Sequence, residues 1–215
     1  KAILFDMDGV LVDNTAYHLK AWQIFLRKHG LKFSEKEFKE KILGRINPEI
    51  LSIVFGKSIS PNQIKKFADE KERLYRKIYL PHIKPVKGLE SFLGTLQRDK
   101  IRIALATAAP KENVNFFLRN TGTKKFFHAI ILMDDIRKGK PDPEVFLKAA
   151  KKLKIQPASC IVIEDSLGGI KAAKRAKMKV VGVLTTHSRK ELGKADLFIK
   201  DFSEGERKKT LKFLI

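Results

Sequence analysis

The feature that most constrains the fold is a series of short apolar runs, rich in β-branched residues, which recur along the chain. Runs that are short and apolar throughout are typical of strands buried on both faces of a parallel sheet. A weaker run, Asp196 to Ile199, is expected at an edge of that sheet. The five stronger runs are Ala2 to Phe5, Ile101 to Ala106, Ala129 to Leu132, Ile161 to Ile163 and Val180 to Leu184.

Segments of helical length lie between most of these runs and repeat their apolar residues with the period of a helix that buries one face. Because strand and helix alternate, the sequence predicts an α/β fold, a doubly wound parallel sheet. The predicted helices are Leu89 to Arg98, Lys111 to Asn120, Pro143 to Leu153 and Leu167 to Lys177.

One stretch interrupts this alternation. Residues 14–80 have helical periodicity and no convincing strand, with turn signals at Gly30, Gly44, Gly56 and Pro61. We expect an inserted, all-helical cap subdomain there, and an α/β core domain formed by residues 1–13 and 81–215. Both ends of the insertion lie near the acidic residues after the first strand, so the subdomain could close over them as a lid.

Composition places the chain among ordinary globular proteins. Its 215 residues are 43% hydrophobic, which is enough for a full core. The single cysteine, Cys160, excludes an internal disulfide, and no apolar run approaches the roughly 20 residues that span a bilayer. The first segment leads directly into acidic residues and not into a cleavage site. We therefore expect a cytoplasmic, monomeric protein without a membrane partner.

The formal net charge of +21 is the one compositional outlier, and alone it would suggest a nucleic-acid or anionic-surface partner. Lysines occur in nearly every segment, however, and we interpret the spacing of the densest acid-free cluster as running around a helix. A solvated basic surface is therefore predicted, without nucleic-acid binding. The cluster consists of Lys171, Lys174, Arg175, Lys177 and Lys179.

Polar residues follow the predicted strands at the points where ligands bind in parallel α/β sheets, beyond the carboxyl ends. Four carboxylates, a hydroxyl and an ammonium are expected to converge there. The segments are Asp6-Met7-Asp8-Gly9-Val10, Thr107-Ala108-Ala109, Gly139-Lys140-Pro141-Asp142-Pro143 and Glu164-Asp165-Ser166.

Carboxylates at this density repel one another unless a cation neutralises them, and Mg²⁺ prefers such oxygen ligands. The predicted ligands are Asp6, Asp165 and the backbone carbonyl of Asp8, with Glu164 binding directly or through water. Lys140 and the Thr107 hydroxyl would then contact phosphoryl oxygens.

Asp6 and Asp8 are assigned different roles because they are two residues apart on an extended chain. Asp6 is the predicted nucleophile, since a carboxylate aligned on phosphorus can form an aspartyl phosphate. Asp8 is the predicted general acid and base. The alternative for such a pair is a simple turn. Likewise, Thr107 could be a helix cap and Lys140 a surface lysine, whereas Asp142 and Ser166 are expected to be structural caps.

These motifs, in this order, resemble the four motifs of the haloacid dehalogenase superfamily over nearly the whole chain. Phe5 to Asp13, Gly139 to Pro143 and Glu164 to Ala173 are similar to the branch that contains β-phosphoglucomutase and sugar phosphatases, as is the helical insertion. The resemblance implies an Mg²⁺-dependent phosphatase that hydrolyses a small phosphomonoester, with a sugar phosphate as substrate. It also implies substrate contacts from Thr107, Ala108 and Lys140.

The same resemblance implies substrate contacts from the cap, at His18, Trp22, Gly44, Arg45 and Lys71. The alternatives are a half-buried packing pair for His18 and Trp22, and a solvated basic face for Lys71. The other histidines lack metal-ligand spacing.

A β-phosphoglucomutase is the nearest rival function. Similar mutases have a lysine just before the cap-loop glycine and an arginine three residues after it, where this chain has Leu43 and Asn47. Asn14 likewise replaces a threonine that is usual in those mutases. We therefore favour the phosphatase. From a different class, a nucleic-acid-binding protein on an inactive scaffold remains a competing hypothesis.

Overall fold

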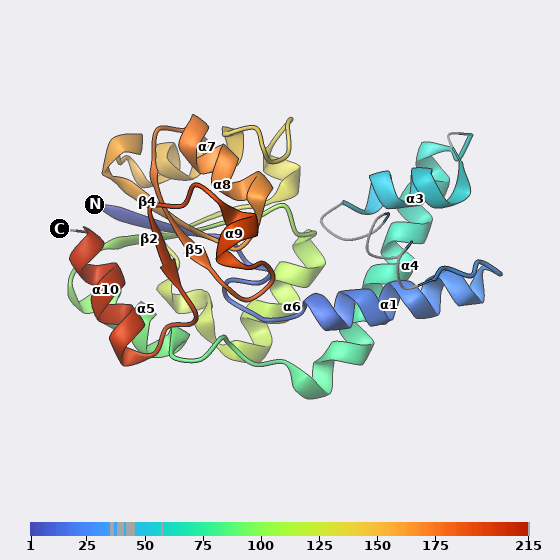
Figure 1. The fold of residues 1–215 in the computed structure, drawn as a ribbon, viewed down its shortest axis with the longest axis horizontal. Coiled ribbons are helices and arrows are strands. Elements are labelled where there is room, and N and C mark those ends of the chain that lie inside the picture. Colours follow the sequence, from blue (N-terminus) through green and yellow to red (C-terminus); the bar gives the residue numbers. More distant parts are fainter. Residues whose placement is uncertain (35–36, 38–40, 42–45, 57, 215) are drawn as a thin grey trace. The chain divides into compact units, whose positions relative to one another are not determined.

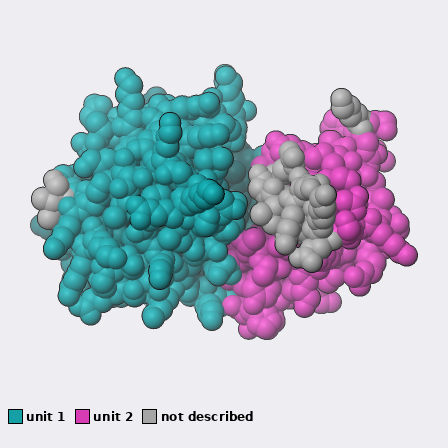
Figure 2. Space-filling model, viewed as in Figure 1, with its two compact units in different colours: residues 1–13, 83–215 teal, residues 14–82 magenta. Residues whose placement is uncertain are grey.

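The computed structural model describes residues 1–34, 37, 41, 46–56 and 58–214 (Figure 1). It divides into two compact units, coloured separately in Figure 2. Unit 1 comprises Lys1–Asp13 with Ile83–Ile215, and unit 2 comprises Asn14–His82. The chain therefore leaves the first unit once, early in the sequence, and returns to it.

Unit 1 is built on one parallel sheet of six strands, in the order β3-β2-β1-β4-β5-β6. The predicted doubly wound fold is confirmed, with the weak sixth run at an edge. The strands are β1 (Ala2–Phe5), β2 (Arg102–Ala106), β3 (Ala129–Ile131), β4 (Cys160–Glu164), β5 (Lys179–Val183) and β6 (Leu197–Ile199).

The central strands are apolar except at Arg102, where β2 begins, and Glu164, where β4 ends, because both of their faces are covered, as the continuous runs predicted. All residues of β1 and β4 are buried. Phe5, the last residue of β1, is in register with Leu105 of β2 and Ile163 of β4. The residues that follow these three positions therefore leave the sheet at the same edge.

Helices cover the two faces of this sheet, with α7 and α8 on one side and α5 and α10 on the other (Figure 1). The four predicted helices are present as α5 (Leu89–Arg98), α6 (Lys111–Thr121), α7 (Glu144–Leu153) and α8 (Leu167–Arg175). Two further helices were not predicted, α9 (Arg189–Leu192) and α10 (Glu204–Leu214). Short 3₁₀ turns are η2 (Thr123–Phe126), η3 (Met133–Asp135) and η4 (Pro157–Ser159).

The described part of unit 2 is helical and contains no strand. Its elements are α1 (Thr15–Lys28), α3 (Asn47–Phe55), α4 (Pro61–Tyr79) and the 3₁₀ turn η1 (Leu80–His82). A capping box at Ser60 and Gln63, with Pro61 at the first helical position, starts α4. These helices share an apolar core of Trp22, Phe25, Leu26, Ile50 and Leu51. The turn predicted at Gly44 lies outside the described residues.

A backbone hydrogen bond within unit 1 joins the two sides of the insertion point. The Val86 N–H donates to the Leu11 carbonyl, with 2.9 Å between nitrogen and oxygen. The chain thus departs after Asp13 and returns at Ile83 beside segments that the core holds together.

None of the helices in the described residues combines the length and the apolar character needed to cross a membrane.

Candidate active site

The loop after β1 folds tightly around its own backbone. The Met7 carbonyl accepts hydrogen bonds from the N–H groups of Val10, Leu11 and Val12, at 3.2, 2.8 and 3.3 Å. Gly9 turns with φ of +73°, and a Cβ built there would overlap the Asp165 carboxylate. Only glycine fits this position, because any side chain would displace that carboxylate.

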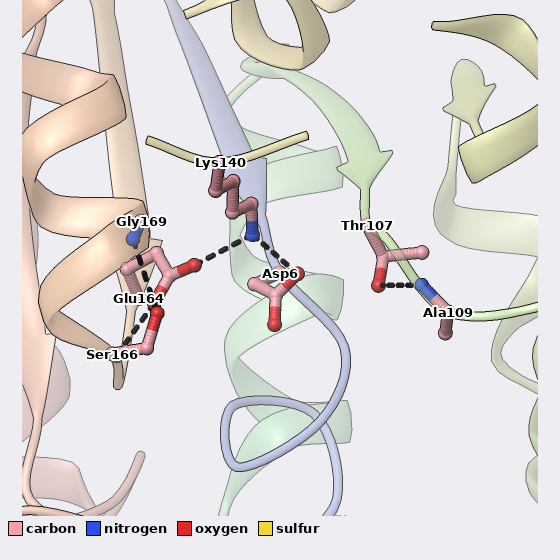
Figure 3. A network of polar contacts seen from close by, with 7 residues as sticks. All are labelled: Asp6, Thr107, Ala109, Lys140, Glu164, Ser166 and Gly169. Carbon is pink, nitrogen blue, oxygen red and sulfur yellow. Dashed lines mark hydrogen bonds and ion pairs between the residues drawn. The ribbon is translucent and has the colours of Figure 1, made fainter. Parts of the chain in front are cut away.

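A buried ion-pair cluster occupies the carboxyl edge of the central strands (Figure 3). The Lys140 ammonium lies 2.7 Å from Oδ1 of Asp6 and 2.6 Å from Oε1 of Glu164. Asp6 is 7% exposed and Glu164 is fully buried. Lys140 is therefore not one more surface lysine. It comes from the segment before α7 and reaches carboxylates that follow or end two adjacent strands, β1 and β4.

Residues at the start of α8 hold the second carboxylate oxygen of Glu164. The Oε2 atom of Glu164 accepts hydrogen bonds from the backbone N–H and the hydroxyl of Ser166, at 2.7 and 2.9 Å. The Ser166 hydroxyl in turn accepts from the Gly169 N–H at 3.1 Å, which confirms Ser166 as a helix cap. A Cβ on Gly169 would overlap the Glu164 carboxylate, so the helix start and this acid are packed as one unit.

The electrostatics of the cluster follow from burial and charge. Burial raises the pKa of Asp6 to about 6, with Glu164 adding to the rise and Lys140 opposing it. Burial raises the pKa of Asp165 well above its usual range, helped by Glu164 and Asp6. Burial alone would lower the pKa of Lys140, but the two carboxylates outweigh it and hold that pKa above its ordinary value. One permanent ammonium thus faces three buried carboxyl groups.

This donor set fits a hard divalent cation. One oxygen from each of Asp6, Glu164 and Asp165 lies within 4.8 Å of the others, and all three residues are buried. Oxygen donors and an excess of negative charge suit Mg²⁺. Asp8 is half-buried and is not among these three carboxylates. Its predicted contribution through the backbone carbonyl stays a prediction.

Thr107 follows β2 at the same edge and is 1% exposed. Its hydroxyl accepts from the Ala109 N–H at 3.1 Å, within its own turn (Figure 3). The helix that follows has Pro110 at its N-cap and no side-chain cap, so the alternative of Thr107 as a helix cap is wrong. Ala108, between these residues, is half-buried.

Two threonines that the sequence reasoning missed also contact the site. The Thr185 hydroxyl donates to the Gly9 carbonyl, and the Thr186 side chain hydrogen-bonds Asp165. Both lie just beyond β5, which ends at Val183. The rule that led to the other residues, polar groups after an apolar run, would have found this pair as well.

Within unit 2, a separate buried polar cluster surrounds Lys71. The Lys71 ammonium lies 2.8 Å from Nδ1 of His18 and 2.8 Å from Oε1 of Glu72. The Asn47 side-chain amide donates to the same Glu72 oxygen at 2.7 Å. Lys71 is only 2% exposed, so the alternative of a solvated basic face is wrong for this residue.

The aromatic side chains of unit 2 enclose this cluster. The His18 ring stacks on Tyr75 at 3.7 Å between centroids, and Trp22, 3% exposed, belongs to the unit's apolar core. Burial and, to a smaller extent, the charge of Lys71 together lower the pKa of His18 to about 3, so the imidazole is neutral near pH 7. Gly44 and Arg45, the other predicted cap contacts, lie outside the described residues.

Comparison with known proteins gives consistent relatives. A family model described as haloacid dehalogenase-like hydrolase matches residues 3–183. β-Phosphoglucomutase of Bacillus subtilis is 33% identical over 214 residues, covering 95% of this chain and 91% of its own length. Phosphorylated carbohydrates phosphatase of Thermotoga maritima is 31% identical over 189 residues, covering 86% of this chain and 85% of its own.

Coverage differs for a plant relative. The chain spans 54% of the length of the chloroplastic 5-amino-6-(5-phospho-D-ribitylamino)uracil phosphatase of Arabidopsis thaliana, with 31% identity over 202 residues and 94% of this chain matched. Among solved structures, a HAD hydrolase of family IA, variant 3, from Entamoeba histolytica has a TM-score of 0.89 and 33% identity, with 99% of each chain covered.

Proposed function

This chain belongs to the haloacid dehalogenase-like hydrolase family, and we propose that it is an Mg²⁺-dependent phosphatase that hydrolyses a small phosphomonoester. The observation that carries the proposal is the buried cluster in which Lys140 pairs with Asp6 and Glu164, beside Asp165. Such a cluster can bind a phosphate dianion only when a cation neutralises the negative charge of the carboxylates.

The residues of the cluster suit distinct parts of a phosphoryl transfer. Asp6, Asp165 and the backbone carbonyl of Asp8 would hold Mg²⁺, which when bound neutralises phosphate charge as a Lewis acid. Both Glu164 oxygens already accept hydrogen bonds, from Lys140 and Ser166, which favours a contact through water for this residue.

The proposed reaction has two steps, formation of an aspartyl phosphate and its hydrolysis. An Asp6 oxygen forms a bond to phosphorus as the bond to the ester oxygen breaks, and Asp8 protonates the departing alkoxide. Water then attacks the aspartyl phosphate, Asp8 takes its proton, and inorganic phosphate leaves while Asp6 is restored. The Lys140 ammonium is held where it can stabilise charge on the phosphoryl oxygens during both steps.

The substrate we propose is a phosphorylated carbohydrate. Support comes from the Thermotoga maritima relative, whose name describes a phosphatase of phosphorylated carbohydrates, and from the β-phosphoglucomutase relative, which is named for a sugar phosphate. Thr107, Ala108 and Lys140 would contact the phosphate, and His18, Trp22, Gly44, Arg45 and Lys71 the rest of the molecule.

The polar cluster of unit 2 favours a phosphatase over a mutase. A mutase must hold the second phosphate of a bisphosphate intermediate, which needs net positive charge. The charge of Lys71 is already balanced by Glu72, and the neighbouring His18 is neutral. Asn47, where similar mutases have an arginine, donates to Glu72 instead. This cluster suits a neutral, hydroxyl-bearing group better than a second phosphate.

We expect inorganic phosphate to be released from one or more sugar phosphates in the presence of Mg²⁺, without isomerisation. A panel of sugar phosphates, followed by phosphate release, tests this. A separate reaction with β-glucose 1-phosphate and a trace of β-glucose 1,6-bisphosphate follows glucose 6-phosphate and inorganic phosphate independently. Rapid formation of glucose 6-phosphate with little free phosphate would assign the chain to the mutases.

Metal removal is expected to abolish turnover, because the carboxylates of the site would then repel the substrate phosphate. Activity is measured after dialysis against EDTA and again after addition of Mg²⁺, which should restore it. Addition of Ca²⁺ at the same concentration is the control, since its larger size and looser coordination should support little turnover. Full activity in the chelator would remove the metal from this mechanism.

A further inference from the structure

The positive charge of unit 1 is concentrated in one part of its sequence. Residues 145–190 contain eleven lysines and arginines and only two acidic residues, Glu164 and Asp165. Both of these acids are buried in the active-site cluster. The surface formed by this segment therefore has no exposed carboxylate of its own.

The structure places six of these eleven charges on two helices of one side of the sheet, contrary to the interpretation that they run around a helix. Lys179 is an exception, because its ammonium lies over the ring of Phe213 in α10, on the other side. Helix α8 buries Ala172, Ala173 and Ala176 against the core, so that Lys171, Lys174 and Arg175 share its exposed face. Helix α7 buries its apolar face in the same core cluster and turns Lys148, Lys151 and Lys152 outward. Both helices lie on the same side of the sheet (Figure 1).

Two adjoining hollows lie on this basic face. One, of about 390 Å³, is lined by Leu147, the η4 turn, Arg175 at the end of α8, and Lys177 just beyond that helix. The other, of about 450 Å³, begins at Leu147, and basic side chains outnumber acidic ones in its lining. The basic residues are Arg137, Lys138, Lys148 and Lys151, and the acidic ones are Asp142 and Glu144. The shared residue Leu147 makes the two hollows neighbours, so the basic face is concave along α7.

Several of these cations have no acidic partner. Lys148 pairs with Glu144 and Lys174 with Asp196, at 2.8 and 2.5 Å. Within the part of the chain that the structure describes, Lys151, Lys171 and Lys177 make no ion pair, and all three are exposed. Their charges are available to an external anion.

We propose that this concave basic face, formed by α7, η4 and α8, binds the phosphate backbone of double-stranded nucleic acid without reading its sequence. A hollow with an excess of basic side chains fits a convex, regularly charged backbone better than a flat lipid surface. The residues lining the two hollows include no aromatic side chain for base stacking. Contacts limited to phosphates give affinity but no sequence preference.

This surface is separate from the catalytic cluster, and the proposal does not rest on the proposed phosphatase activity. Only the first turn of α8, through Ser166 and Gly169, contacts Glu164. Lys171 and Lys177 lie further along the chain, towards the opposite end of the helix and beyond it. Substitution of Lys151, Lys171 and Lys177 should therefore leave phosphate release intact.

The test measures fluorescence anisotropy of short labelled DNA and RNA duplexes of random sequence, titrated with the full chain at several salt concentrations. In a variant carrying Lys151→Gln, Lys171→Gln and Lys177→Gln, we expect at least a tenfold loss of affinity. The slope of log K against log salt should fall in magnitude by about 2.7, about 0.9 for each lost phosphate contact.

A matched control carries Lys111→Gln, Lys124→Gln and Lys212→Gln, which changes the net charge equally at exposed sites outside α7, η4 and α8. It should bind like the wild type. Equal losses in the two variants, or no binding by the wild type, would overturn the proposal. So would binding only to vesicles that contain phosphatidylserine. Unchanged phosphate release and thermal midpoint confirm that each variant is folded.

Discussion

Replacing Asp6 with asparagine is expected to lower kcat by about 10⁴-fold or more, because it removes the proposed nucleophile while keeping almost the same shape. The fold should survive this change. The amide oxygen can still accept the hydrogen bond from Lys140, and one of three mutually repelling carboxylates is lost. Phosphate release and thermal unfolding are measured on the same preparation, and the thermal midpoint is not expected to fall.

Two comparisons make this result specific. Asp99→Asn, at an exposed position after α5, should leave both activity and stability unchanged. Beryllium fluoride with Mg²⁺ mimics a phosphoaspartate and should raise the thermal midpoint of the wild type but not that of Asp6→Asn. If Asp6→Asn retains substantial turnover, the covalent mechanism is wrong.

Replacing Lys140 with methionine should affect catalysis and stability together. We expect kcat to fall by about 10²- to 10³-fold with a smaller change in KM, since the ammonium acts most strongly as charge redistributes in the transition state. In chelator, the free energy of unfolding should fall by about 3–5 kcal/mol, because buried Asp6 and Glu164 lose their shared cation.

Added Mg²⁺ should recover part of this lost stability and should therefore stabilise Lys140→Met more than the wild type. Denaturant unfolding with and without Mg²⁺ measures the difference. Lys138→Met is the matched control, because Lys138 lies in the same segment with an exposed side chain. A change confined to KM, or equal stabilisation of Lys140→Met and wild type by Mg²⁺, would contradict the assigned role.

The central sheet could be predicted from the sequence because burial on both faces leaves a continuous apolar run. The predicted run Ala2 to Phe5 coincides with β1, and the run Ile101 to Ala106 contains β2. The weaker elements follow other signals. Helix α9 is a single turn defined by the capping box of Ser188 and Glu191, and α10 buries little beyond Thr210 and Leu214. Neither has enough apolar periodicity to stand out.

The core site was predictable to the extent that strand ends share one edge of the sheet. That rule placed Lys140 with Asp6 and Glu164, although Lys140 lies 134 residues from Asp6 in the sequence. The same rule predicts no contacts for residues that lie outside the strand ends, such as those of unit 2. The contact of Glu72 with Asn47 depends on how α3 packs on α4, which periodicity alone does not specify.

The arrangement of the basic residues on α8 could not be predicted from their spacing in the sequence. Counting lysines along the chain suggested an even coating, because sequence spacing ignores which helical face is buried. Once the alanines of α8 are known to face the core, the intervening lysines must all point outward together. The exposed face of a helix is therefore predicted from its buried residues, and the spacing of its charged residues alone does not define it.

The hydrogen bond between Leu11 and Val86 affects how easily an inserted segment can be gained, lost or replaced during evolution. Since the core itself holds the two ends of the excursion side by side, the length of that excursion affects the core mainly through loop-closure entropy, which grows only with the logarithm of length. A doubling of the inserted segment would cost about 0.6 kcal/mol. The junction between Asp13 and Ile83 is thus a point where evolution can graft or shorten a module while the catalytic scaffold remains intact.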